Sequence, residues 1–478
     1  MDVPTYPSLV TVRRPAVSQS TLDRAQDQAK AFRNGESLPY QDLLDGALVE
    51  SVLAEEKLKF RIRTYTPLVT LWTFLTQVLD QDHSCRQAVS RLIAFLVSQG
   101  QPPVSPDTGN YCKARKRLPL SFIVRLVRET GQLLQRKASP AWLWKGREVF
   151  MVDGSTVSMP DTPANQKAFP QPRTQKPGLG FPIARFLVII GLATGAVLDL
   201  AIGPYKGKRT GETSLLRTLL KRLKKGAILL GDRCFASYFG IAALADPGID
   251  GVFRMHQGRK IDFRRGRCLG IEDHLVLWHK PKRPEWMDVA TYEQMPDEMW
   301  VRELRFRVQQ PGYRVREIVL VTTLLDVVEY TKEELADLFL KRWNIELDIR
   351  SIKIVMQMDV LRCQSPDMVE KEVWVHMLAY NIIRAFMATA ALKTGAHPRE
   401  LSFKGTLQAI SAFRDTLRMA APEHRAQLWE AMFVVIGYDR VGDRPGRVEP
   451  RCKKRRPKPY HMLTIPRHEA RKALLDAA

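Results

Sequence analysis

The sequence is poor in cysteine, and its cysteines are widely spaced. Six cysteines occur among 478 residues, and none combines with a second cysteine or with histidines at the short spacing of a zinc site. The chain is long enough for two to four domains with cores of their own. We therefore expect reduced thiols in a cytoplasmic protein.

Long apolar runs and a secretory signal are also missing. No apolar stretch approaches the roughly 18 residues that a membrane-spanning helix requires. The N-terminus has no basic segment followed by an apolar run, so we expect no secretory signal. The hydrophobic content of 45% is ordinary for a globular protein. These features predict a protein without a membrane partner.

Acidic residues are outnumbered. The chain has 74 Lys and Arg against 51 Asp and Glu, a formal net charge of +23. Such a surface most often serves a polyanionic partner, usually nucleic acid. The segment from Arg447 to Lys458 contains one acid, Glu449, and is predicted to be a basic arm. A basic surface that only keeps the protein soluble is the alternative.

The stretch from Thr331 to Asp359 is predicted to form one long helix. Thr331 is a suitable N-cap, and Glu334 can complete a capping box. Helical spacing places five apolar residues on one stripe: Leu338, Ile345, Ile349, Ile352 and Met356. Beside it runs a second line that contains one acid among cations: Phe339, Arg342, Glu346, Arg350 and Lys353. This line suits a metal ligand flanked by phosphate contacts, although Arg and Glu four residues apart are also common on solvated helices.

Between residues 146 and 256 the hydrophobic period changes to that of strands. Three β-rich runs come first, followed by a basic loop, a helix, a fourth strand, another helix and a fifth strand. This order predicts an α/β fold with a ribonuclease-H-like catalytic core. Asp153 ends the first strand and Asp232 follows the fourth, its neighbour in that fold. We expect the basic loop residues Lys206, Lys208 and Arg209 to contact the DNA backbone.

The remaining regions are predicted around this core. Residues 1–145 form a helical N-terminal DNA-binding region, in which Arg115 and Arg117 belong to a basic connector that is either a DNA contact or a solvated loop. The stretch from Asp232 to Glu346 is too long for one strand and one loop, so residues 257–316 are predicted to be a β-rich insertion. Residues 317–395 complete the core, and residues 396–478 form a helical C-terminal region with a basic tail and a possible role in dimerisation.

The spacing Phe339-x2-Arg342-x3-Glu346-x6-Lys353 resembles the Tyr-x2-Arg-x3-Glu-x6-Lys signature of DDE transposases of the insertion-sequence-four family. The resemblance implies that Asp153, Asp232 and Glu346 bind two Mg²⁺ ions, for which Mn²⁺ can substitute. It also implies phosphate contacts by Arg342 and Lys353, and the loss of a phenolic hydroxyl at Phe339. Close relatives hold a flipped base on a tryptophan, and here Trp278, Trp286 and Trp300 either substitute for it or pack the insertion.

The resemblance implies a cut-and-paste DNA transposase. Such an enzyme binds the terminal inverted repeats of its element in double-stranded DNA as a homodimer on paired ends, cleaves them, and joins the 3′-OH ends to target DNA. We expect it in the cytoplasm of a prokaryote, associated with the nucleoid. Two alternatives remain: a ribonuclease-H-like nuclease or resolvase without strand transfer, and a non-catalytic DNA-binding repressor derived from a transposase.

Overall fold

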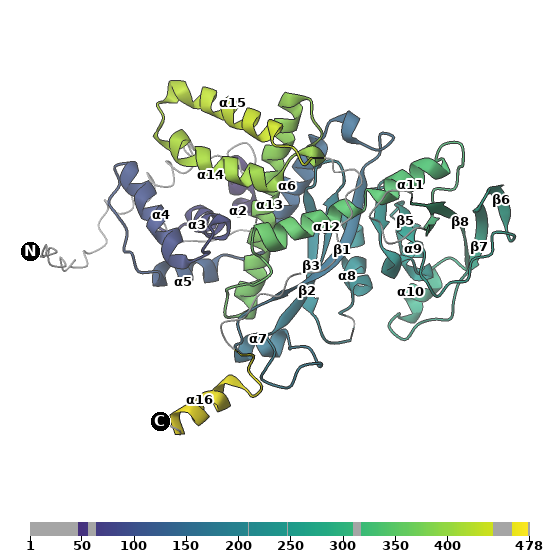
Figure 1. The fold of residues 1–478 in the computed structure, drawn as a ribbon, viewed down its shortest axis with the longest axis horizontal. Helices are drawn as coiled ribbons and strands as arrows, with labels where there is room; N and C mark the ends of the chain where they lie inside the picture. The colour runs from purple at the N-terminus through teal and green to yellow at the C-terminus, as the bar shows by residue number, and fades with distance from the viewer. Residues whose placement is uncertain are drawn as a thin grey trace, which may run out of the picture.

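A nine-stranded mixed sheet forms the centre of the molecule (Figure 1). The computed structural model describes residues 46–55, 64–208, 210–245, 247–308, 317–442 and 461–476. The strand order across the sheet is β3-β2-β1-β4-β5-β9-β8-β7-β6. The strands are β1 (Val149–Ser158), β2 (Ile183–Gly191), β3 (Val197–Pro204), β4 (Ile228–Gly231), β5 (Asp250–Arg254), β6 (Arg267–Gly270), β7 (Asp273–His279), β8 (Glu298–Arg307) and β9 (Glu317–Thr322).

The first five strands occur along the chain in the predicted order. β1, β2 and β3 are antiparallel neighbours, and the turn between β2 and β3 contains Gly195 with φ of +77°, a conformation that glycine adopts without strain. β4 lies parallel to β1, and β5 lies parallel to β4. The first four residues of β1 are buried, as expected for a central strand covered on both faces. This mixed sheet with its helices agrees with the predicted α/β class.

The strands of the predicted insertion extend the core sheet. β9 pairs antiparallel with β5 on one side and with β8 on the other, and β7 and β6 follow outward. Residues 257–308 therefore add their strands to the core through β9, at the opposite end of the molecule from the N-terminal helices (Figure 1). The short helix α10 (Val289–Gln294) lies between β7 and β8 in sequence.

Helices cover the sheet and form a separate layer beside it (Figure 1). The N-terminal helices are α2 (Gly46–Glu55), α3 (Pro67–Leu79), α4 (Cys85–Ser98), α5 (Gly109–Arg117) and α6 (Leu120–Arg136). Within the first five strands lie α7 (Pro163–Ala168), α8 (Glu212–Leu219) and α9 (Tyr238–Ala245), and the C-terminal helices are α13 (Pro366–Thr394), α14 (Phe403–Met419), α15 (Pro422–Tyr438) and α16 (Arg467–Asp476). The basic arm predicted from Arg447 to Lys458 lies outside the described residues.

Helix α13 is the central helix of this layer. It packs against α3, α6, α14 and α15, and nearly all its side chains from Met368 to Ala391 are buried. It is long and apolar enough to cross a membrane by composition alone, yet 89% of its apolar window is buried inside the protein. Its apolar character is thus explained by packing in the core.

The prediction of one uninterrupted helix from Thr331 to Asp359 was wrong. The segment forms α11 (Lys332–Leu340), α12 (Trp343–Arg350) and one π-helical turn, η4 (Ser351–Val355). Around Arg342 the backbone hydrogen bonds change from four-residue to three-residue spacing, as in the bond from the Ile345 amide to the Arg342 carbonyl. The predicted capping box of Thr331 and Glu334 is present. The five residues of the predicted apolar stripe are all buried.

Candidate active site

The sheet register brings two of the predicted acids side by side. β1 and β4 are parallel, with Val149 opposite Ile228 and Met151 opposite Leu230. Two residues beyond the last pair, the same register places Asp153 opposite Asp232. β4 ends just before Asp232, whereas β1 continues past Asp153 to Ser158, so the prediction that the first strand ends at Asp153 was wrong. Because neighbouring strands lie about 4.8 Å apart, the two backbones are adjacent there.

Glu346 reaches the same place from helix α12. The Nη2 atom of Arg342 lies 3.0 Å from Glu346 Oε1, and its Nη1 atom lies 3.9 Å from Asp153 Oδ2. A single guanidinium group therefore bridges the acid of the helix and the acid of the first strand. The Arg342 side chain is mostly buried, which strengthens its interaction with both carboxylates.

Helix α12 is held in place by a buried acid on its opposite face. Asp348 is two residues after Glu346, so the two side chains project in nearly opposite directions. The Nη1 atom of Arg399 lies 2.7 and 2.8 Å from the two carboxylate oxygens of Asp348, and Arg384 also pairs with this group. Both arginines lie after α12 in sequence, so these ion pairs tie the helix to the C-terminal layer. They explain how Glu346 keeps its orientation toward the strands.

Asp153 occupies a poorly solvated position among other carboxylates. Burial raises its pKa to about 6, against the lowering effects of the Gly154 amide and Arg342, and the negative charges of Glu212 and Glu346 raise it further. Its Oδ1 atom accepts a hydrogen bond of 2.8 Å from the Gly154 amide. The surroundings of Asp153 disfavour its ionised form, so a bound cation would stabilise the ionised carboxylate there.

Glu212 is a fourth acid that the sequence analysis missed. It opens helix α8, and its Oε2 atom accepts a contact of 3.7 Å from the Cys234 thiol, two residues after Asp232. A Cβ atom at Gly154 would lie 2.7 Å from Glu212 Oε1, so the glycine permits this close approach. Burial, with the nearby Glu212, Asp232 and Asp153, raises the pKa of the Cys234 thiol far above its usual range. The sequence did contain a signal for Glu212, because it is the acid that begins the first helix after the third strand.

Lys353 lies where the resemblance places a cation. Its Nζ atom donates a hydrogen bond of 3.1 Å to Ser155 Oγ, two residues after Asp153. Burial lowers the pKa of this lysine, with a smaller opposing effect of Asp359. The contact joins the π-helical turn η4 to β1 and keeps the ammonium group beside the acids.

The other predicted DNA contacts fall into two groups. Arg350, Lys206, Lys208 and Arg117 are exposed, as a DNA contact requires, and Arg209 lies outside the described residues. Arg115 and Phe339 are buried and pack against other side chains of the protein. Arg115 belongs to helix α5 and packs between the rings of Phe74 and Tyr111, with its Nη1 atom 3.0 Å from Gln77 Oε1. Phe339 packs in the core below Arg342.

The donor atoms present suit magnesium, although they form no closed cage. Among the residues described, no three His, Cys, Asp or Glu side chains converge closely enough to hold one metal ion. Magnesium keeps several waters and is commonly held by one or two carboxylates together with substrate phosphates. Glu346 shares Arg342 with Asp153, and Glu212 lies close to Gly154, so the carboxylates near Asp153 fit a divalent ion whose coordination the substrate completes.

Comparison with known proteins shows the family to which the chain belongs. The transposase DDE domain family matches residues 144–382, which span the whole site from β1 to the middle of α13. The chain belongs to this family of DDE transposases. The transposase InsG of insertion sequence element IS4 from Escherichia coli is 29% identical over 433 residues, covering 88% of this chain and 92% of that protein. This similarity confirms the predicted resemblance to the insertion-sequence-four family.

Two further similarities are more limited. The putative transposase InsZ from Escherichia coli is 26% identical over 129 residues, which cover 26% of this transposase and 41% of that protein. A piggyBac transposase in a synaptic complex with hairpin DNA has a TM-score of 0.40 and 11% identity, covering 86% of this chain and 85% of that chain. The transposase is thus an enzyme of DNA transposition encoded by an insertion sequence, and its family generally uses divalent metals.

Proposed function

We propose that this transposase moves its element by a cut-and-paste mechanism at a site built from Asp153, Asp232 and Glu346. What supports the proposal is the Arg342 bridge between Asp153 and Glu346, together with the β1–β4 register, which sets the Asp232 backbone beside that of Asp153. The substrate would be the terminal inverted repeats of the element in double-stranded DNA, held by a homodimer on paired ends. Its place of action would be the bacterial cytoplasm, on the nucleoid.

The three acids would hold two Mg²⁺ ions, or Mn²⁺ in their place. When bound, these ions activate water or a 3′-OH for attack and stabilise the leaving oxygen at the same phosphorus. The protein supplies carboxylate oxygens fixed on β1, after β4 and on α12. It requires no nucleophilic side chain, and the Cys234 thiol, with its raised pKa, is unsuited to that role.

The neighbouring cations would orient the DNA strand. Lys353, held by Ser155, offers an ammonium group to a phosphate beside the cleaved bond. Arg342 balances the charge of Asp153 and Glu346. When a metal ion takes over this role between the two carboxylates, Arg342 can turn toward a phosphate. These roles need both side chains beside the carboxylates, and the contacts of Arg342 with Asp153 and Glu346 and of Lys353 with Ser155 support them.

Strand transfer separates this proposal from its alternatives. The protein is incubated with Mg²⁺, a duplex that carries the DNA flanking its gene, and a supercoiled target plasmid. We expect cleaved ends whose 3′-OH groups become joined to the plasmid. Cleavage without joined products would favour a nuclease or resolvase, and binding without cleavage would favour a repressor derived from a transposase.

A further inference from the structure

A basic pocket lies beside the carboxylate site, on the side toward the insertion. It has a volume of about 770 Å³, and its wall includes Arg233, His256, Arg259 and Lys260 but no Asp or Glu. It begins at the residue after Asp232 and continues to the segment that follows β5. Because β4 and β5 are parallel, this is the same sheet edge that carries Asp153 and Asp232.

Arg259 is the best-oriented cation of this pocket. Its guanidinium carbon lies 3.5 Å from the centre of the Trp278 ring, so the two planar groups are in contact. Trp278 is only 2% exposed, and its Nε1 atom donates a hydrogen bond of 2.8 Å to Glu303 Oε1. Glu303 Oε2 also lies 3.1 Å from His274 Nε2. The carboxylate that holds the Trp278 ring is therefore itself fixed by a second partner.

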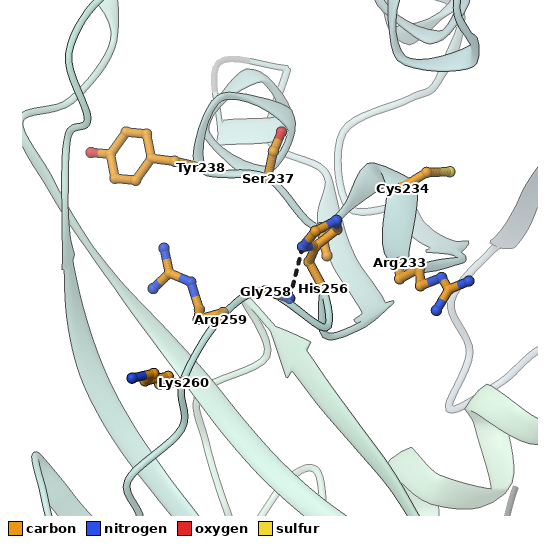
Figure 2. A pocket seen from close by; sticks show the side chains of 9 residues that line it. Arg233, Cys234, Ser237, Tyr238, His256, Gly258, Arg259 and Lys260 are labelled. Carbon is orange, nitrogen blue, oxygen red and sulfur yellow. Dashed lines mark hydrogen bonds between the residues drawn. The ribbon is translucent and has the colours of Figure 1, made fainter.

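No acceptor for the donor groups of Arg259 is found among the described residues. Within the part of the chain that the structure describes, its guanidinium makes no hydrogen bond and no ion pair. The nearby His256 Nδ1 atom accepts a hydrogen bond from the Gly258 amide, so Nε2 is the free donor of the neutral ring. Figure 2 shows Arg259 and Lys260 on one side of His256, and Arg233 on the other. The pocket therefore presents donors and positive charge together.

These groups select a phosphate rather than a base. The ring of Trp278 is covered by Arg259, and the hydroxyl of Tyr238 donates to the Pro296 carbonyl. Of the two roles considered for Trp278, packing in the insertion fits this buried ring better than stacking on a displaced base. Guanidinium and ammonium groups without carboxylate partners are suited to phosphodiester oxygens.

We propose that this pocket binds the phosphodiester backbone of the DNA strand where it passes Asp232, with Arg259 as the main contact. The proposal rests on the proposed function, because it takes DNA as the substrate. It adds a defined subsite at which Trp278 acts as a positioning residue for the cation. A strand held there would run along the sheet edge from the carboxylates toward β5.

The test compares Arg259→Ala with Arg267→Ala, which removes the same charge from an exposed position on β6. Binding to a duplex with the element end and to a random duplex is measured over a range of salt concentrations. For Arg259→Ala we expect affinity about 10-fold lower and a salt slope reduced by about one on both duplexes, as for loss of one phosphate contact. Arg267→Ala should leave the slope closer to that of the wild type.

Uncharged phosphates locate the contact. A series of duplexes carries one methylphosphonate at each position near the cleavage site. At one position, the methylphosphonate should lower the affinity of the wild-type protein for DNA as much as Arg259→Ala does. At that same position it should cause no further loss of affinity in the Arg259→Ala variant. The subsite would be overturned if Arg259→Ala and wild type had equal salt slopes, or if Arg259→Ala and Arg267→Ala lost equal affinity for DNA. Either result would leave the proposed function intact. A wild-type protein that neither binds nor cleaves end DNA would overturn both.

Discussion

Replacing Asp153 with asparagine should stabilise the metal-free protein at neutral pH while it abolishes cleavage. The pKa of Asp153 is raised from 3.8 to about 6. The folded protein therefore binds more protons than the unfolded chain between these values, and its free energy of unfolding falls as pH rises through that window. At about 1.36 kcal/mol per pKa unit, the cost above pH 7 is about 3 kcal/mol at most.

Solvent access reduces this figure. The Asp153 side chain is 24% exposed, so we expect Asp153→Asn to raise the free energy of unfolding by about 1–3 kcal/mol at pH 8. At pH 5 about half of that gain should remain, because the folded carboxyl is then mostly protonated while the unfolded one is ionised. The asparagine Oδ1 atom can still accept from the Gly154 amide, so the local hydrogen bond is kept.

The assay is urea denaturation in EDTA at pH 5 and pH 8. Asp337→Asn, the same chemical change at an exposed position on α11, is the matched control and should change stability by less than about 0.5 kcal/mol. If Asp153→Asn is no more stable than wild type at pH 8, or if its gain in free energy of unfolding grows as pH falls, burial does not disfavour the ionised Asp153 carboxylate.

Three further predictions concern the cations. Replacing Lys206 and Lys208 together by alanine should lower the salt slope of DNA binding by up to about two, and an unchanged slope would make them a solvated loop. Lys353→Ala should cost about 1 kcal/mol of stability, measured by urea denaturation, through its lost hydrogen bond to Ser155. It should reduce cleavage or joining of end DNA far more than binding to random DNA, and full activity would show the cation to be idle. Arg115→Ala should lower the free energy of unfolding by about 2–4 kcal/mol, without changing the salt slope, whereas a stable variant with weakened DNA binding would restore the original prediction.

The core and its acids were predictable because their signals are local. Asp153 and Asp232 each follow a run of apolar residues, and Glu346 stands at a fixed spacing from Arg342 and Lys353. Parallel pairing of β1 and β4 then brings the first two acids together without further information. Strand order and motif spacing thus predicted the elements from which the candidate site is built.

The failures depended on contacts between distant segments. Arg115 has the sequence context of a DNA-binding cation, yet its partners Gln77 and Cys85 come from other helices, which the local pattern does not reveal. The break near Arg342 occurs in a stretch without glycine or proline, so backbone propensity gave no warning of it. Glu212 looked like an ordinary first-turn acid, and only the fold brings it to Gly154.

The most direct test of the central claim measures Mg²⁺-dependent nicking of element-end DNA by wild type and by Glu346→Gln. Binding of the same duplex is measured in parallel, because affinity should come mainly from the +23 charge of the chain rather than from the metal ligands. We expect the variant to bind the duplex with wild-type salt dependence and to produce no nicks. A variant that nicks at the wild-type rate would contradict the assignment of Glu346 to the catalytic site.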